Sequence, residues 1–349
     1  MGIDGVWFLA VVALASFLAS ALVTRLLCGH GLGLRHIIDE PNERSLHQTP
    51  VPRTGGIGLL AGIVLVAGVS AGLGGLPAGW PWIGAALALV GGVSFLDDRA
   101  EVPRRWRLGA HVGAAALLMV GGLWWADLDL PWTHWELPAT LALPLTGFYV
   151  IWMINLYNFM DGMDGFAGGM TVLGFGALAV LGWRAGDLAY ATLAVIPAAA
   201  GGGFLTSNFP PARIFLGDVG SSALGLLAAG LSLLGAQRGL FPLWVAWLAF
   251  SPFIVDATWT LVRRLLRGER LWLAHRSHHY QRLVLAGWGH RKTVLRSYVL
   301  MAASAATAVA GARMPASDQA LLLASWVGIY VLIHLKVGLV ERAAPRGRG

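Results

Sequence analysis

The stretch PATLALPLTGFYVIWMI, residues 138–154, is a predominantly apolar segment, and the polar stretch NLYNFMDGMDG, residues 155–165, follows it directly. The second stretch places two amides, Asn155 and Asn158, and two carboxylates, Asp161 and Asp164, at the end of a segment suited to a membrane. Charged groups at such a boundary are costly to desolvate, and they mark functional sites. The two stretches therefore predict a membrane helix that ends in a functional polar segment.

The rest of the chain has the composition of an integral membrane protein. Of its 349 residues, 56% are hydrophobic and only 12% are charged, whereas soluble globular chains contain about 25% charged residues. Its 16 tryptophans are typical of the interfacial belts of bilayer proteins. The single cysteine, Cys28, excludes an intrachain disulfide framework. The net charge of +7 favours contact with anionic lipid, so we expect the lipid bilayer as a partner and no nucleic acid.

Apolar stretches near the length of a bilayer crossing recur along the whole chain. They predict an all-α polytopic membrane protein with about 11 transmembrane helices. The predicted spans are residues 6–28, 54–74, 81–96, 108–125, 138–154, 165–182, 188–205, 219–236, 241–262, 295–312 and 319–340.

Basic residues set the expected orientation of these spans. Most of the 25 lysines and arginines fall in the loops after the odd-numbered spans or in the C-terminal tail. The positive-inside rule therefore predicts the N-terminus outside and the C-terminus in the cytoplasm. We expect a single integral-membrane domain over residues 1–349. Its predicted cytoplasmic segments are loops at about 29–53, 97–107, 155–165, 206–218 and 263–294 and a basic tail at 341–349.

Two further acidic motifs fall on the same predicted face. Asp97 and Asp98 end one predicted span, and Asp218 lies in FLGDVGSS, residues 215–222, directly before another. Each motif has an ordinary alternative: Asp97 and Asp98 as interfacial charge, and Asp218 as the cap of a helix N-terminus. Convergent carboxylates repel one another unless a cation lies among them. Oxygen ligands in small number favour Mg²⁺, with Mn²⁺ as a second choice.

The polar residues of the 155–165 stretch recur at every third position. On an α-helix each such step turns by about 300°, so the ends of the series drift apart, whereas a 3₁₀ turn would align them. Gly162 and Gly165 also disfavour a regular helix. We therefore expect a loosened helix end whose amides and carboxylates face one cavity. A solvated turn between spans is the alternative.

Cationic groups suited to an anion are concentrated in HRSHHYQR, residues 275–282. The arginines here oppose a metal ion, and guanidinium groups bind phosphate through paired hydrogen bonds. The segment therefore resembles an anion receptor, with a basic loop touching lipid headgroups as the alternative. In the first predicted loop, His47 and Arg53 are further phosphate candidates, with solvated loop residues as the alternative. The candidates in the later segment are His275, Arg276, His278 and His279.

Taken in order, these motifs resemble those of the polyprenyl-phosphate N-acetylhexosamine-1-phosphate transferases, the group that contains WecA and MraY. The histidine segment lacks the Pro-x-His-His-His run of MraY-type chains, and it is more similar to bacterial enzymes that initiate O-antigen or capsule chains. The matching motifs are His47-Gln-Thr-Pro with Gly55-Gly56, Asp97-Asp98, Asn158-Phe-Met-Asp161-Gly-Met-Asp164-Gly, Phe215-Leu-Gly-Asp218-Val-Gly-Ser and the His275–His279 segment.

The resemblance implies a reaction at the bacterial inner membrane. A UDP-N-acetylhexosamine donates its sugar 1-phosphate to undecaprenyl phosphate, UMP is released, and Mg²⁺ is required. Family members are often dimers, so the resemblance also suggests a homodimer. The implied roles are Asp218 and Asp161 for the metal, Asp97 and Asp98 for the acceptor phosphate, Asn155, Asn158 and Asp164 for the nucleotide sugar, and the 275–279 segment for phosphate or sugar.

Acid–base chemistry limits what the carboxylates need to do. The acceptor is a phosphate monoester with a second pKa of about 6, so it is largely dianionic at neutral pH. A strong general base adds little, whereas bringing two anionic phosphates together requires positioning and charge neutralisation. We therefore expect Asp97 and Asp98 to orient the acceptor or the metal more than to remove a proton.

Two other classes of membrane protein compete with this interpretation. A transporter for a charged solute would also use membrane-embedded acids, but it predicts polar residues near the midplane with access from both sides. Here the acidic motifs share one predicted face. CDP-alcohol phosphotransferases carry Asp-Gly-x-x-Ala-Arg, whereas Asp164-Gly-Phe-Ala-Gly-Gly lacks the arginine.

Overall fold

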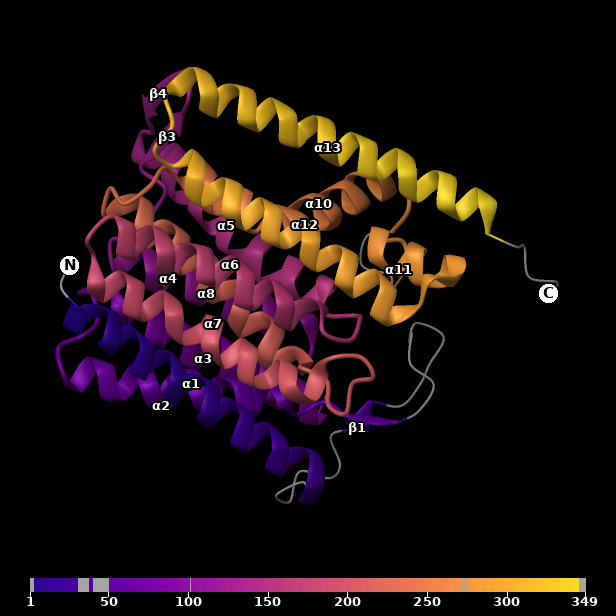
Figure 1. Ribbon diagram of the computed structural model, residues 1–349, viewed down its shortest axis with the longest axis horizontal. Helices are drawn as coiled ribbons and strands as arrows, with labels where there is room; N and C mark the ends of the chain where they lie inside the picture. Colours follow the sequence, from indigo (N-terminus) through magenta and orange to yellow (C-terminus); the bar gives the residue numbers. More distant parts are fainter. Residues whose placement is uncertain are drawn as a thin grey trace.

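Helices dominate the computed structural model, which describes residues 3–30, 38–39, 50–100, 102–270, 273 and 275–344 (Figure 1). The elements are α1 (Ile3–His30), β1 (Ile38–Asp39), β2 (Val51–Pro52), α2 (Gly55–Gly72), α3 (Trp80–Ala100), α4 (Arg104–Val120), β3 (Asp127–Leu130), β4 (Thr133–Glu136), α5 (Ala139–Met160), α6 (Phe166–Arg184), α7 (Leu188–Asn208), α8 (Gly217–Gln237), α9 (Leu243–Ala249), α10 (Ser251–Leu266), α11 (His279–Leu283), a π-helical turn (Val284–Trp288), α12 (Gly289–Gly311) and α13 (Ala316–Ala343).

The protein is an all-α polytopic membrane protein. Every predicted span falls on a helix or on the bent pair α9–α10. Within the described residues, nine helices are long and apolar enough to cross a membrane, and the bent pair gives a tenth if it is counted as one span. The remaining predicted span, 108–125, falls on α4, whose 17 residues rise only about 25 Å.

The functional motifs gather at one end of the helix bundle. In Figure 1, α1 begins at the left end, and α13 ends at the right, as an odd number of crossings requires. Strands β1 and β2, the last turn of α5, the start of α8 and helix α11 belong to the right-hand end, whereas the β3–β4 hairpin lies at the other. The predicted orientation of this right-hand end toward the cytoplasm stays a prediction.

Helix α8 is the central helix, and its sequence explains why. Nearly every residue from Gly217 to Gly235 is buried, and most are Gly, Ala, Ser or Leu, which let neighbouring membrane helices approach closely. At Gly225 a Cβ would lie 2.4 Å from the carbonyl oxygen of Met153 on α5. Helix α13 is the opposite case, since only Trp326 and Val337 are buried on it.

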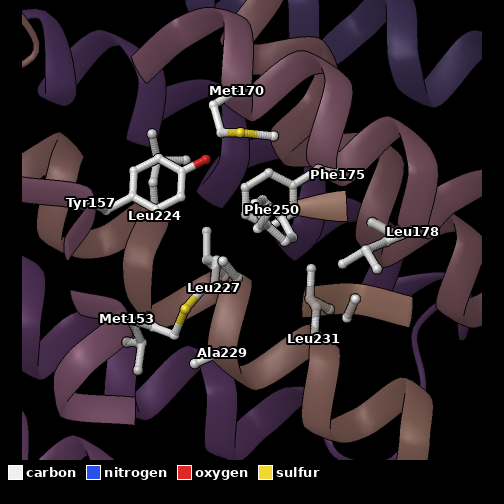
Figure 2. Packing of buried hydrophobic residues seen from close by; sticks show 14 of the residues in the cluster. Met153, Tyr157, Met170, Phe175, Leu178, Leu224, Leu227, Ala229, Leu231 and Phe250 are labelled. Carbon is white, nitrogen blue, oxygen red and sulfur yellow. The ribbon is translucent and has the colours of Figure 1, made fainter. Parts of the chain in front are cut away.

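Aromatic packing holds the break between α9 and α10. The two helices meet at an angle of 83°, with Pro252 in the first turn of α10. Phe250 at this corner is 1% exposed, and its ring packs edge-on against Tyr157 of α5 and Phe175 of α6 (Figure 2). The corner therefore directs α10 toward the end of the bundle that carries the acidic motifs.

Backbone hydrogen bonds join two of the motif segments. The amides of Gly55 and Gly56 donate to the carbonyls of Phe215 and Leu216 at 2.8 and 2.7 Å, and the amide of Phe215 donates to Pro52 at 2.7 Å. At Gly56 a Cβ would lie 2.4 Å from the amide nitrogen of Gly220, so the starts of α2 and α8 touch through backbone. This contact requires glycine and fixes the N-terminus of α8.

Candidate active site

Polar side chains from several helices line one cleft of 550 Å³ at the motif-bearing end of the bundle. The cleft lies among α3, α4, α5, α8, α10 and the segment that leads into α11. The residues that line it are Ser94, Asp97, Arg104, Arg107, Leu108, His111, Ile154, Asn155, Asn158, Phe159, Asp218, Ser222, Ala257, Leu261, Leu273, His275, His278 and Gln281.

Asp218 is the centre of the polar network in the cleft. Asn158 of α5 donates from Nδ2 to Asp218 Oδ1 at 2.8 Å and to Ser221 Oγ at 3.1 Å. Two guanidinium groups flank the carboxylate, with Arg53 Nη2 3.7 Å from Oδ1 and Arg107 Nη1 3.7 Å from Oδ2. Asp218 also lies in the first turn of α8, where the helix dipole favours a negative charge.

Asp97 faces the same cleft and is held from two sides. Arg107 Nη1 donates to its Oδ2 at 2.7 Å, and the amide of Val102 donates to its Oδ1 at 2.7 Å. Because the same Arg107 nitrogen also approaches Asp218, this arginine bridges carboxylates on α3 and α8. The Arg107 guanidinium thus places a positive charge between Asp97 and Asp218.

Asp98 has a different role from its neighbour. Its side chain is only 2% exposed, and it accepts hydrogen bonds from the amides of Asp218 at 3.2 Å and Val219 at 3.1 Å. Arg53 Nη2 donates to its Oδ1 at 2.8 Å. Asp98 thus caps the N-terminus of α8 from another helix and positions Asp218. It is not one of the residues that line the cleft.

Gly217 makes this cap geometrically feasible. Its φ angle is +72°, and a Cβ there would lie 2.4 Å from the carbonyl oxygen of Arg53 and 3.0 Å from Asp98 Oδ2. Arg53 is half-buried, and although burial alone would lower the pKa of its guanidinium, the carboxylates of Asp98 and Asp218 raise it above its ordinary value. Arg53 therefore remains a fixed positive charge behind Asp218.

The 155–165 stretch is divided between helix and turn. Helix α5 continues through Asn155 and Asn158 to Met160, and the chain turns at Asp161, whose φ and ψ are −89° and 43°. Asn155 Nδ2 donates to Ile151 O at 2.7 Å and lies 3.5 Å from His111 Nδ1 in the cleft. Desolvation and the nearby Asp218 carboxylate raise the pKa of Asp161 well above its ordinary value.

Asp164 lies outside this cleft and instead links the turn after α5 to two distant segments of the chain. Its Oδ2 accepts from the Ala212 amide at 3.0 Å, and its Oδ1 is 3.0 Å from His290 Nδ1 on α12. Burial alone would raise the pKa of Asp164, but the His290 ring and the Ala212 amide overcome this and lower the pKa. Of the four polar residues expected to face one cavity, Asn155 and Asn158 line the cleft, whereas Asp161 and Asp164 are not among the residues that line it.

The histidine segment also divides between two sides of α11. His275 and His278 line the cleft, and burial lowers the pKa of His275 to about 4, with His278 and Arg264 adding to the effect. His279 lies toward Asp256 and His334, with its Nδ1 3.2 Å from Asp256 Oδ1. The remaining candidates are Arg276, which is half-buried beside the cleft, and His47, which lies outside the described residues.

Several cleft residues were missed by the sequence interpretation. Arg104 and Arg107 follow the Asp97–Asp98 pair closely, but they were used only to set orientation. His111 lies one turn beyond Arg107 and shares its helix face. Asp256 is an acidic residue inside the predicted span 241–262, a position that itself signals a functional or structural site. Its Oδ1 accepts from the His279 amide at 2.8 Å and so supports the histidine segment.

Comparisons with known proteins show the family of this chain. The model of the family described as Glycosyl transferase family 4 matches residues 80–236, which carry Asp97, Asp98, Asn158, Asp161 and Asp218. A probable undecaprenyl-phosphate N-acetylglucosaminyl 1-phosphate transferase from Bacillus subtilis (strain 168) is 32% identical over 271 residues, 75% of this chain and 74% of the relative. The chain belongs to glycosyl transferase family 4.

Other relatives within the WecA/MraY group differ in the substrates that their names state. A phospho-N-acetylmuramoyl-pentapeptide-transferase from Synechococcus sp. (strain JA-3-3Ab) is 33% identical over 295 residues, 76% of this chain and 81% of the relative. A decaprenyl-phosphate N-acetylglucosaminephosphotransferase from Mycobacterium tuberculosis (strain H37Rv) is 30% identical over 295 residues, which are 74% of this chain and 72% of the relative. This family 4 member is a phosphoglycosyltransferase, and the alternative of a solute transporter is set aside.

Proposed function

We propose that this enzyme transfers an N-acetylhexosamine 1-phosphate from its UDP-sugar to undecaprenyl phosphate. An oxygen of the acceptor phosphate attacks the phosphorus that bears the sugar, and the bond from that phosphorus to the oxygen of UMP breaks. The products are N-acetylhexosamine-diphospho-undecaprenol and UMP. We place the reaction at the cytoplasmic face of the bacterial inner membrane, as the first step of O-antigen or related envelope polysaccharide synthesis.

The observation that carries the proposal is the Asp97–Arg107–Asp218–Asn158 network in the cleft. It joins carboxylate oxygens with a guanidinium group at the end of an apolar bundle, where a lipid phosphate and a water-soluble diphosphate can meet. Phosphoryl transfer depends mainly on positioning and charge neutralisation, and these residue types supply both. The names of the relatives above also support the substrate class.

The donor atoms fit a hard divalent cation. Within the described residues no group of three or more His, Cys, Asp and Glu side chains converges to hold a metal. Mg²⁺ commonly takes one or two carboxylates and completes its shell with water and substrate phosphates, so Asp218 with Asp97 or Asp161 suffices, and Mn²⁺ suits the same oxygens. When bound, the ion would neutralise charge on the donor diphosphate.

The residues around Asp218 have separate tasks in the proposed reaction. Arg107, released in part from Asp97 and Asp218 when the anionic substrates enter, binds phosphate through its fork of N–H donors. Asp98 and Arg53 keep the start of α8 and hence Asp218 in place. His275, neutral at physiological pH because its pKa is lowered to about 4, serves as a hydrogen-bonding group.

The test is UMP release by the purified full-length protein with undecaprenyl phosphate, Mg²⁺ and a panel of UDP-N-acetylhexosamines. We expect release with at least one donor and only when undecaprenyl phosphate is present. Absence of acceptor-dependent release with every donor would overturn the proposal. The panel includes donor sugars that differ at single hydroxyl positions. Assaying them in parallel identifies the preferred sugar, because pockets discriminate such sugars through a few hydrogen bonds.

Arg107→Gln and Arg105→Gln form a matched pair for the same assay. The two variants remove the same charge from the same turn of α4, but only Arg107 lines the cleft, whereas Arg105 is exposed and outside it. We expect Arg107→Gln to lose activity by roughly 10–100-fold, the worth of one charge-assisted hydrogen bond. Equal effects of the two substitutions would contradict the proposed role of Arg107.

A further inference from the structure

A second cavity of 430 Å³ lies on the far side of α11 from the cleft. Its walls come from α10, α11, α12 and α13, and they are mainly apolar. On α11 the two cavities take different residues, since His279 and Tyr280 line this one while Gln281 lines the cleft. The residues that line it are Phe166, Pro252, Val255, Asp256, His279, Tyr280, Leu283, Trp288, Thr293, Arg296, Ser297, Val299, Leu300, Tyr330, Ile333, Lys336 and Val337.

Two cationic side chains enter this apolar lining from facing helices. Arg296 lies seven residues after the start of α12, and Lys336 lies seven residues before the end of α13. Each is therefore about 10 Å from its helix end. Both ends lie beside α11, which Arg282 joins to Glu341 of α13. The two positive charges consequently lie at a similar depth along the bundle.

Neither cation has a carboxylate partner in the described part of the chain. The Arg296 guanidinium lies 4.3 Å from the centre of the Trp288 ring. The acidic residue in the lining, Asp256, is already engaged, because its Oδ1 accepts from the His279 amide at 2.8 Å and lies 3.2 Å from His279 Nδ1. Both residues are exposed at the mouth of the cavity, and cations at the depth of a bilayer are costly unless they reach the interface or pair with an anion.

Thr293 adds an independent sign of a missing polar ligand. It lines the same cavity and is 1% exposed. Its hydroxyl is buried without a hydrogen-bond partner among the residues that the structure describes. Buried polar groups are almost always hydrogen-bonded, so a donor or acceptor from outside the chain would satisfy this hydroxyl.

We propose that the cavity between α12 and α13 binds an anionic glycerophospholipid, with the lipid phosphate at Arg296 and Lys336 and an acyl chain along the apolar walls. A free phosphate would leave those walls uncovered. A phosphate held here cannot be the reacting acceptor phosphate, because α10 and α11 stand between this cavity and Asp218. The site therefore binds a lipid that is distinct from the two proposed substrates.

The test is retention of defined lipids by the purified full-length protein, measured by native mass spectrometry. The probes are phosphatidylglycerol, phosphatidylcholine with the same acyl chains, undecaprenyl phosphate and inorganic phosphate. The double variant Arg296→Gln/Lys336→Gln is compared with Arg291→Gln/Arg342→Gln, because Arg291 on α12 and Arg342 on α13 are exposed cations that do not line the cavity. A third variant, Thr293→Val, keeps the side-chain volume and removes the hydroxyl.

We expect the wild type to retain phosphatidylglycerol over phosphatidylcholine. Each basic residue near a lipid surface contributes about 1 kcal/mol, or about fivefold, so the double variant should lose affinity by roughly 25-fold. Thr293→Val should weaken retention in the same direction and remains informative if the double variant does not fold. Equal losses in the control pair, equal retention of the two phospholipids, or retention of inorganic phosphate alone would overturn the proposal.

Undecaprenyl phosphate distinguishes this site from the reaction cleft. We expect it to bind the double variant as well as the wild type and to leave the bound phosphatidylglycerol in place. If undecaprenyl phosphate displaced phosphatidylglycerol, and the double variant lost both, the cavity would belong to the acceptor and the proposal would be wrong. Because lipid retention is measured without turnover, this result is independent of UMP release.

Discussion

Gly217→Ala tests whether the start of α8 is the element on which the site depends. The φ angle of +72° costs an L-residue about 1–2 kcal/mol. The added methyl would also lie 2.4 Å from the Arg53 carbonyl and 3.0 Å from Asp98 Oδ2, and such overpacking costs about 1–3 kcal/mol. The free energy of unfolding should therefore fall by roughly 2–5 kcal/mol. A shift of about 1 Å at Asp218 would reduce the turnover rate by about 100-fold.

Gly186→Ala is the matched control for backbone strain. Gly186 has a φ angle of +83° with no atom within 4 Å of an added Cβ, so it isolates the cost of the left-handed conformation. It should lose about 1–2 kcal/mol of unfolding free energy and keep full UMP release. Unfolding in detergent and UMP release are measured on both variants. The reasoning fails if Gly217→Ala matches Gly186→Ala in both measurements.

Two further substitutions test the acidic residues. Asp97→Asn weakens the hydrogen bond from Arg107 and should lower the activity by roughly 10–100-fold. The activity should not recover between about pH 7 and 9, because the acceptor phosphate is already dianionic there. Recovery at high pH would instead indicate that Asp97 is a general base. Folding lowers the pKa of Asp164, so the ionised carboxylate stabilises the folded state at pH values above its unfolded pKa of about 4. This stabilisation is lost as the pH falls through the pKa of the folded state. The stability gap between wild type and Asp164→Asn should therefore shrink from pH 6 to pH 3 in thermal unfolding, and a gap that stays constant would contradict the pairing with His290.

The sequence predicts the helices well because their signal is local. Apolar runs near 20 residues have few alternatives in a chain of this composition, so every predicted span coincides with a helix or with the bent pair α9–α10. The acidic motifs also share one end of the bundle, as the spacing of the spans requires. Periodicity along one segment could not fix where α5 ends, and the helix continues past Asn158 to Met160.

Side-chain partners could not be predicted, because they depend on contacts between distant segments. Asp97 and Asp98 are adjacent in sequence, yet one faces the cleft and the other caps α8, since neighbouring residues on a helix point in different directions. Asp164 pairs with His290, which lies 126 positions later. His279 begins α11 and lines the second cavity, whereas His278 directly before it lines the cleft, so two adjacent histidines face different sides.

The link between Gly55–Gly56 and Phe215–Leu216 has a consequence for biogenesis. The chain is synthesised from its N-terminus, so α2 and α3 enter the membrane while α8 is still untranslated. Until residues 215–219 are made, Gly55 and Gly56 lack the carbonyls to which their amides donate, and Asp98 lacks the two α8 amides from which it accepts. Insertion of the central helix is thus required before α10 and the segment leading into α11 can complete the catalytic end, and nascent chains that stop short of α8 must remain inactive however many spans they have already inserted.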